Sequence, residues 1–439
     1  MSLVQYQYNY RKIIGFLVFF LFIYGPYVKI GLINIQTMRI IGGILVWYFI
    51  CLAMTNKVSK SFLPVFNLLF VFIIYVLFRY VTAHYQDNMF ITSTVLLMFY
   101  VIASYTLAYY SLNYLKLSVQ ELLHILFLIT VINSIILIIF FFYSPLRSFM
   151  YKFIVMRDWS EEYLSYRMVS INGTTASHLS FLIYLGAIAG IVNSQYYKRK
   201  FVYILSYFII IFSMIITGRS GMYMFFFIFP IVLLIRASFT KHSLLSSIWA
   251  LLSSIIIYLL IVAAIFGLDI LSDFRPNLEK ALYRSFSMYY QLTIISLVDQ
   301  PTIIDFFEQH FFLPDSWDTL MFGCGTFGRN IEQTGFYLPS DVGYIKNIFG
   351  FGLTGFFLQT LVYIYMSYQA LKRININKEL SIYVNTIIFS LFIIHIKSIY
   401  FGDSCTTIFL FGSYFFLVLY KTNIQLEIMN TQKKNKLEQ

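Results

Sequence analysis

Residues 121–143 read ELLHILFLITVINSIILIIFFFY, and this stretch decides the fold class of the chain. It contains one acidic residue, at its first position, and no Lys or Arg. About 18 or more apolar residues with almost no charge can cross the ~30 Å hydrocarbon core of a bilayer as a helix. The run is also far longer than the ~10-residue alternating strands of a membrane β-barrel. The stretch therefore predicts a membrane-spanning helix.

The rest of the chain has the same character. Apolar and aromatic residues make up 59% of its 439 residues, and charged residues make up 11%, against roughly 25% in soluble domains. A soluble domain of this size has no core large enough to bury so much apolar surface. The composition excludes a disordered chain, a coiled coil and a disulfide-stapled secreted domain. We predict an all-α integral membrane protein.

About twelve apolar runs predict about twelve transmembrane helices, which together form a single polytopic membrane domain over residues 1–420. The Lys-rich residues 421–439 form a basic tail. The predicted spans are 13–33, 38–55, 62–81, 89–110, 121–143, 179–195, 201–217, 221–235, 247–270, 348–371, 380–398 and 404–420.

The positions of Lys and Arg predict the orientation. One side of the predicted spans carries 17 of the 31 basic residues and four of the 19 acidic residues, which leaves 14 basic and 15 acidic residues on the other side. Cytoplasmic loops of membrane proteins carry the excess of Lys and Arg. We therefore expect the first side, both termini and the basic tail to be cytoplasmic. This asymmetry explains the net charge of +12 without a nucleic-acid partner.

Two predicted outer segments, residues 144–178 and 271–346, are too long to be turns, whereas every inner connection is short. Loops on a rigid scaffold commonly carry function, so recognition or catalysis is expected at the outer face. Within the second loop, residues 282, 286, 289 and 293–294, all apolar except Thr293, approximate helical spacing. They predict an amphipathic helix at the membrane interface.

The sharpest candidate site residue is Arg219, within TGRSG at 217–221. Charge beside hydrocarbon is costly and marks functional candidates. Glycines on both sides let the backbone approach a ligand closely, and a guanidinium can hold a phosphate through two hydrogen bonds. The alternative is a tight hairpin whose Arg extends to the lipid headgroups.

The two long loops supply further candidates. Arg157 of the first loop lies among mixed charges and an aromatic residue, a set that suits either a glycolipid headgroup or an ordinary solvated loop. In the second loop, Arg284 lies near Tyr289 and Tyr290, whose rings could stack on sugars while the Arg contacts phosphate. The alternative for Arg284 is a surface residue.

Three more candidates lie at outer helix ends. Asp341 precedes a predicted span, where its carboxylate could accept a proton from a sugar hydroxyl or simply cap the helix. His395 and Lys397 lie near the outer end of another span, and the alternative for Lys397 is a side chain that extends to the headgroups. The histidines and cysteines lack metal-ligand spacing, and we find no nucleotide-binding loop. We predict no metal and no cofactor.

Four groups of motifs lie within about residues 217–400: GRSG at 218–221, Arg284 followed by FGCGTF at 322–327, SDVGYI at 340–345 with GFGLTG at 350–355, and HIK at 395–397. With these motifs the chain resembles the O-antigen polymerase (Wzy) family, which is related to the O-antigen ligases. An Asp at 341, where ligases usually have His, favours the polymerase. An Arg-x15-Gly pattern found in some polymerases occurs here at 157–173, at a frequency expected by chance, and is absent from the second loop.

The resemblance implies metal-independent glycosyl transfer at the outer face of a bacterial inner membrane. A glycan on undecaprenyl pyrophosphate would be the donor and a lipid-linked repeat unit the acceptor, with membrane lipids, a chain-length regulator and a flippase as further partners. Arg219 and Arg284, assisted by Lys397, would stabilise the leaving pyrophosphate, and Asp341 would act as the base. A polysaccharide flippase and an O-antigen ligase are the alternatives. The span centres are almost free of ionisable groups, which favours an enzyme over a transporter.

Overall fold

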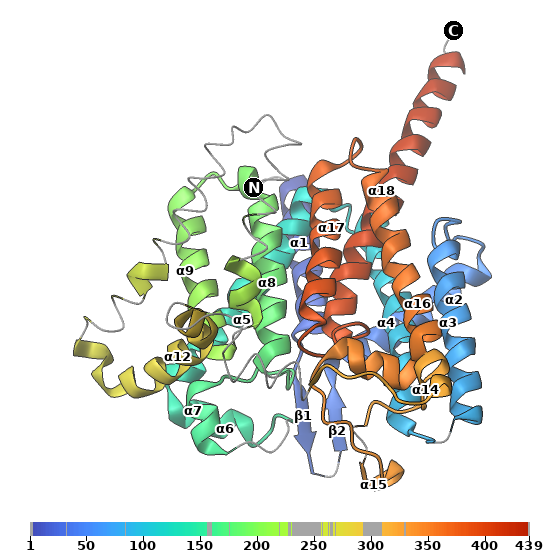
Figure 1. The fold of residues 1–439 in the computed structure, drawn as a ribbon. Helices are drawn as coiled ribbons and strands as arrows, with labels where there is room; N and C mark the ends of the chain where they lie inside the picture. Colours follow the sequence, from blue (N-terminus) through green and yellow to red (C-terminus); the bar gives the residue numbers. More distant parts are fainter. Residues whose placement is uncertain are drawn as a thin grey trace. The chain divides into compact units, whose positions relative to one another are not determined.

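The computed structural model describes most of residues 3–226, 269–292 and 310–437. Short gaps lie at residue 32, residue 84, residues 156–159, residue 175, residue 219 and residues 329–330, and only isolated residues are described between 227 and 268. The described part is almost entirely helical and contains one two-stranded sheet (Figure 1).

The chain divides into two compact units, which are described separately. Unit 1 comprises Met1–Ile41 and Leu117–Leu297, and unit 2 comprises Gly42–Lys116 and Val298–Gln439. Each unit therefore joins an N-terminal segment to a much later part of the chain.

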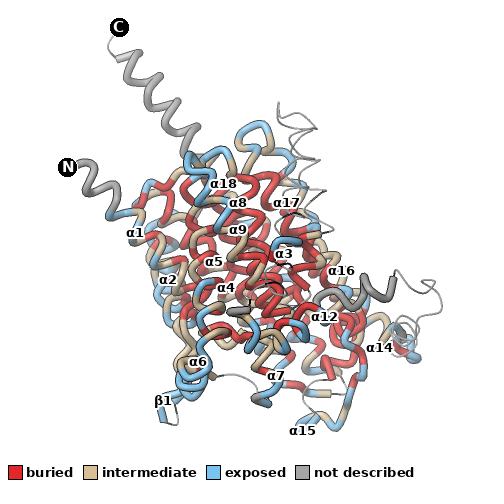
Figure 2. The backbone as a smooth tube through the Cα atoms, turned by 90° about the vertical axis from the view of Figure 1, so that its left-hand side faces the viewer, coloured by how far each residue is buried: buried red, intermediate tan, exposed pale blue. Residues whose placement is uncertain are grey.

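Unit 1 is built around α5 (Val119–Phe142), the helix of the long apolar run. Ser118 and Glu121 begin this helix with a capping box, in which each side chain binds a backbone N–H of the other residue. Around it pack α1 (Leu3–Ile23), α8 (Ala176–Val192) and α9 (Lys200–Thr217). Helix α8 is buried over almost its whole length (Figure 2).

A β-hairpin follows α1, where the apolar pattern predicted that the first span would continue to residue 33. Helix α1 ends at Ile23, ahead of the Gly-Pro pair at 25–26, and β1 (Tyr27–Ile30) then pairs antiparallel with β2 (Ile33–Gln36). Proline cannot continue a helix. The predicted boundary of the first span is therefore wrong, and the hairpin is a local exception in a fold that is otherwise nearly all-α, as predicted.

Short helices connect the long helices of unit 1. The predicted outer segment 144–178 contains α6 (Ser144–Tyr151) and α7 (Glu161–Tyr166), and the second outer segment begins with η2 (Asp269–Phe274) and α12 (Arg275–Leu292). A single 3-10 turn, η1 (Ser194–Tyr196), precedes α9. Helix α12 lies over the region where helical spacing predicted an amphipathic helix, and it begins seven residues earlier.

Unit 2 contains the remaining long helices. Helix α4 (Asn88–Asn113) packs on α18 (Ser404–Leu437), and α3 (Leu63–Thr82) packs on α16 (Gly343–Leu371). Aromatic rings of Phe62, Tyr105 and Phe415 form one cluster of this core. The other elements of the unit are α2 (Thr37–Met54), which begins in unit 1, α17 (Lys378–Ile394), α14 (Trp317–Phe322) and α15 (Ile331–Thr334).

Helix α16 is broken near its N-terminal end. Gly352 has φ 69° and ψ 176°, so the helix consists of a short first part and a long second part. The positive φ favours glycine at this position. The sequence predicted a single span from residue 348, whereas the structure begins the helix at Gly343 and breaks it four residues after that predicted start.

Six of the described helices, α2, α3, α4, α5, α9 and α16, are long and apolar enough to cross a membrane. Helix α3 exposes Phe70, Ile74 and Phe78. Exposed apolar side chains of this kind suit contact with lipid rather than water. Nine of the twelve predicted spans overlap described helices over most of their length, and the first, 13–33, overlaps α1 only over residues 13–23. The other two, 221–235 and 247–270, lie mostly outside the described residues. These features indicate a multi-pass membrane protein.

Candidate functional site

Asp341 lies where the second long loop enters α16 of unit 2. The N-cap residue of α16 is Val342, so Asp341 does not cap the helix. The side chain of Asp341 is 84% exposed, and its carboxylate lies 3.7 Å from Nζ of Lys346, whose side chain is 10% exposed. An exposed carboxylate therefore lies beside a nearly buried ammonium group on the first turn of α16.

Hydrogen bonds fix the backbone around Asp341. Ser340 Oγ donates to the carbonyl oxygen of His310 at 2.7 Å and accepts the N–H of Val342 at 3.1 Å. His310 Nδ1 lies 3.0 Å from the carbonyl oxygen of Pro339. These contacts fix the backbone on both sides of Asp341, whose side chain remains exposed.

His395 is fully buried at the end of α17. Its Nδ1 accepts the N–H of Tyr400 at 3.1 Å, and its Nε2 lies 3.0 Å from the side-chain amide of Asn347. The ring also stacks on Phe401, with 4.1 Å between ring centroids. These contacts make His395 a residue that positions the end of α17 against α16.

The structure brings three of the predicted site residues together. The N–H of Gly343, the first residue of α16, donates to the carbonyl oxygen of His395 at 2.9 Å. Asp341 lies two residues before this contact, and the half-buried Lys397 lies two residues after His395. Asp341, His395 and Lys397 therefore lie around the meeting point of α16 and α17.

Two glycine-rich motifs of unit 2 pack directly on each other. The N–H of Cys324 donates to the carbonyl oxygen of Phe349 at 2.6 Å, and that of Gly325 to Gly350 at 3.2 Å. Gly323 has φ +82°, and a Cβ there would lie 2.3 Å from the carbonyl oxygen of Gly350. Glycines at these positions therefore allow the loop backbone to contact the break in α16. Burial raises the pKa of the Cys324 thiol.

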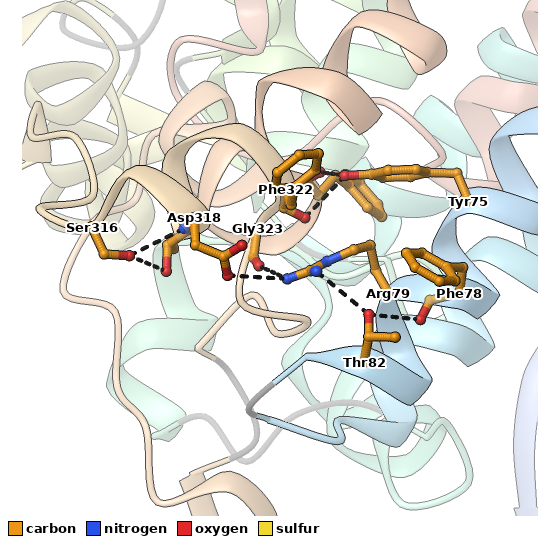
Figure 3. Close-up of polar contacts among 10 residues, drawn as sticks. Tyr75, Phe78, Arg79, Thr82, Ser316, Asp318, Phe322 and Gly323 are labelled. Atoms are coloured by element: carbon orange, nitrogen blue, oxygen red, sulfur yellow. Dashed lines mark hydrogen bonds and ion pairs between the residues drawn. The ribbon is translucent and has the colours of Figure 1, made fainter.

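Arg79 of α3 lies under the same loop (Figure 3). Its guanidinium Nη2 donates to the carbonyl oxygen of Gly323 at 2.6 Å and lies 3.8 Å from a carboxylate oxygen of Asp318. The Tyr75 hydroxyl contacts the carbonyl oxygens of Phe322 and Phe351, at 3.0 and 2.6 Å. Arg79 and Tyr75 thus fasten the end of α14 to α3.

In unit 1, the turn that carries Arg219 is held by Ser180 of α8. Ser180 Oγ donates to the carbonyl oxygen of Gly218 at 2.5 Å and accepts the N–H of Gly221 at 2.9 Å. A Cβ at Gly221 would lie 2.2 Å from the carbonyl oxygen of Ser180. The second glycine is therefore required by helix packing. Arg219 itself lies outside the described residues, between two fixed neighbours.

Parts of the two long predicted loop segments contact each other within unit 1 through α7 and α12. Ser165 Oγ donates to Asn277 Oδ1 at 3.1 Å, and Lys280 Nζ lies 3.0 Å from Glu162 Oε1. The backbone of α12 also carries Arg284, Tyr289 and Tyr290, whose side chains are outside the described part, as is the whole of Arg157.

Sequence reasoning missed Arg79 and Lys346. Arg79 is the only charged residue of the predicted span 62–81, so the rule that charge beside hydrocarbon marks a candidate would have found it. Lys346 carried no comparable signal, because it lies at a predicted loop boundary and its burial depends on the tertiary structure.

Within the described residues, no group of three or more His, Cys, Asp or Glu side chains could hold a metal ion. Comparisons with protein-family models, curated proteins and solved structures found no match to this chain.

Proposed function

We propose that this protein is a metal-independent glycosyltransferase that polymerises lipid-linked oligosaccharide repeat units into a surface polysaccharide. In this proposal, the donor is a glycan on undecaprenyl pyrophosphate, and the acceptor is a single lipid-linked repeat unit. The acceptor hydroxyl attacks the anomeric carbon of the donor, its proton passes to a base, and the lipid pyrophosphate leaves.

The proposal includes a topology. About twelve helices cross a bacterial inner membrane, both termini are cytoplasmic, and the two long segments face the periplasm. Six described helices with sufficient length and apolar character support the membrane location. The excess of Lys and Arg on one side supports the orientation.

The observation that carries the proposal is the group of polar residues at one end of unit 2. An exposed Asp341, a nearly buried Lys346 and the half-buried Lys397 gather where α16 meets α17. Glycosyl transfer from a lipid pyrophosphate needs a base for the acceptor hydroxyl and cations for the leaving group. Asp341 and Lys346, 3.7 Å apart on the first turn of α16, supply one side chain of each kind.

Unit 1 supports the proposal through Arg219 and Arg284, which we assign to the leaving pyrophosphate. Ser180 fixes the backbone on both sides of Arg219. A side chain that holds a phosphate in one geometry needs a backbone that is fixed in this way. Arg284 lies on α12, which the contact with α7 anchors to the first outer segment. Arg157, Tyr289 and Tyr290 would contact the glycan.

The alternatives from the sequence remain a flippase of lipid-linked repeat units and an O-antigen ligase. Both would use the same substrates, so the location of the polar residues bears on them. Groups concentrated at one end of unit 2 support chemistry at one face, whereas a transporter is expected to place charge near the middle of the membrane.

A matched pair of variants on α12 tests the proposal. Arg284→Ala should abolish long polysaccharide in the native host at unchanged protein level. Lys280→Ala removes a basic residue one helical turn away, whose partner is the exposed Glu162, and should leave long chains intact. Polysaccharide gels and an immunoblot of the membranes measure both quantities. Equal chain lengths in the two variants would argue against a role of Arg284 in transfer.

A second pair tests the base in unit 2. Asp341→Asn keeps the size of the side chain but removes its proton acceptor, so it should lower polymerisation at least about a hundredfold. Asp315→Asn, at another exposed position of the same loop, should have no effect. Wild-type chain length in Asp341→Asn would remove Asp341 from the proposed mechanism.

A further inference from the structure

The guanidinium of Arg79 in unit 2 is nearly buried but only partly paired. Nη2 donates to the carbonyl oxygen of Gly323, and Nη1 makes a long contact of 3.4 Å with Thr82 Oγ1. Among the residues that the structure describes, Nε of Arg79 has no hydrogen-bond partner. A guanidinium has five N–H donors, so this side chain retains donor capacity.

The negative charge opposite Arg79 is weakly held. Asp318 lies 3.8 Å from Nη2, which exceeds hydrogen-bond distance, and its side chain is 75% exposed. A buried charge is costly unless it is closely paired. The bond to Gly323 fastens the loop but brings no compensating negative charge.

The surroundings of Arg79 are those expected of a residue near lipid headgroups. It lies in the last turn of α3, one of the helices that can cross a membrane. Phe78 and Val81 of the same helix end are exposed, and so is Trp317 of α14, with 72% of its surface accessible. Aromatic residues concentrate at the membrane–water interface, where the phosphate groups of lipids lie.

We propose that Arg79 binds the phosphate of a lipid headgroup and that Asp318 takes the phosphate's place beside the guanidinium when no lipid is bound. Arg binds phosphate through two parallel hydrogen bonds, and the loosely held carboxylate of Asp318 can turn out to solvent. Phe322 lies over the guanidinium, with 5.8 Å between Cζ and the ring centroid, and limits access from that side.

This inference does not rest on the proposed polymerase, because it concerns binding alone. A chain that forms no polysaccharide still binds the lipid at Arg79. Conversely, a polymerase without this lipid site would keep Arg219, Arg284 and Asp341 as its working residues.

Native mass spectrometry of the full-length protein in detergent tests the site. The probes are dioleoyl phosphatidic acid and dioleoylglycerol, which differ only in the phosphate. Wild-type protein should retain phosphatidic acid in preference to dioleoylglycerol. Arg79→Gln should weaken phosphatidic acid binding by about tenfold or more, as expected for the loss of a charge-assisted hydrogen bond. Equal affinity in wild type and Arg79→Gln would overturn the proposal.

Asp318→Asn should change the affinity for phosphatidic acid in the opposite direction, and it alters only an exposed side chain. Removing the competing carboxylate should strengthen phosphatidic acid binding several-fold, whereas Glu332→Gln, at an exposed acid on α15, should not. An unchanged or weaker affinity in Asp318→Asn, or an equal gain in Glu332→Gln, would contradict the proposal even if Arg79→Gln fails to fold.

Competition with inorganic phosphate shows whether the bound anion is a lipid headgroup or free phosphate. Phosphatidic acid should remain bound at millimolar inorganic phosphate, because the lipid tails add apolar contact with the exposed residues of α3 and α14. Complete displacement at equimolar inorganic phosphate would overturn the assignment to a lipid.

Discussion

Two glycine-containing contacts, one in each unit, differ in what they require of the backbone. In unit 1, Gly221 lets α8 approach closely, and the Ser180 hydroxyl joins both ends of the turn. In unit 2, Gly323 needs the same close approach and also a positive φ. The first glycine therefore has a steric reason alone, and the second has two independent reasons. In both cases the glycines serve packing.

Gly323→Ala should have the largest effect on stability. A non-glycine residue at positive φ costs about 1–2 kcal/mol, and the added Cβ would overlap backbone atoms of Gly350 and Gly352, which cannot move like a side chain. The apparent melting temperature in detergent should fall sharply.

Gly335→Ala is the matched control for this variant. Gly335 has φ +65°, but a Cβ there meets no atom within 4 Å, so the substitution should carry only the backbone cost. Equal losses in the two variants would mean that the contact between the loop and α16 does not stabilise unit 2.

Gly221→Ala should have a smaller but clear effect. Its Cβ would lie 2.2 Å from the Ser180 carbonyl oxygen, so α8 and the turn must separate, typically at a cost of about 1–3 kcal/mol. The melting temperature should fall, whereas Gly412→Ala, in an open position of α18, should be neutral or stabilising by up to about 1 kcal/mol. A stable Gly221→Ala would show that the turn carrying Arg219 is not fixed by packing.

Ser180→Ala should have the smallest effect on stability. It removes the hydrogen bonds to Gly218 and Gly221 without adding bulk, so a loss of about 1–2 kcal/mol is expected. If the turn positions Arg219 for phosphate binding, Ser180→Ala should shorten the polysaccharide more than the loss of folded protein alone explains. Normal chain length together with lowered stability would separate the turn from the proposed chemistry.

The long apolar runs predicted most of the fold, because a spanning helix is specified locally by length and composition. Residues 27–33 were assigned to a helix because hydropathy does not distinguish an apolar strand from an apolar helix, although the Gly-Pro pair at 25–26 marks the end of α1. The break at Gly352 was also missed, because it depends on the approach of a loop more than 20 residues earlier in the chain.

The candidate site was predictable only in part. Asp341 and Lys397 were found because they lie at helix ends, and His395 was found for the same reason, although the structure buries its ring. The pairing of Asp341 with Lys346, and of Arg79 with the loop at Gly323, is set by tertiary packing. No short stretch of the sequence indicates such tertiary contacts.

Deleting the gene in its native host and separating the surface polysaccharide on a gel tests the central proposal most directly. Loss of a polymerase should leave single repeat units attached to the anchor, and the wild-type gene should restore long chains. Loss of a flippase would leave essentially no repeat units, and loss of a ligase would leave polymer off the anchor. Full-length chains on the anchor in the deletion strain would contradict the proposed function.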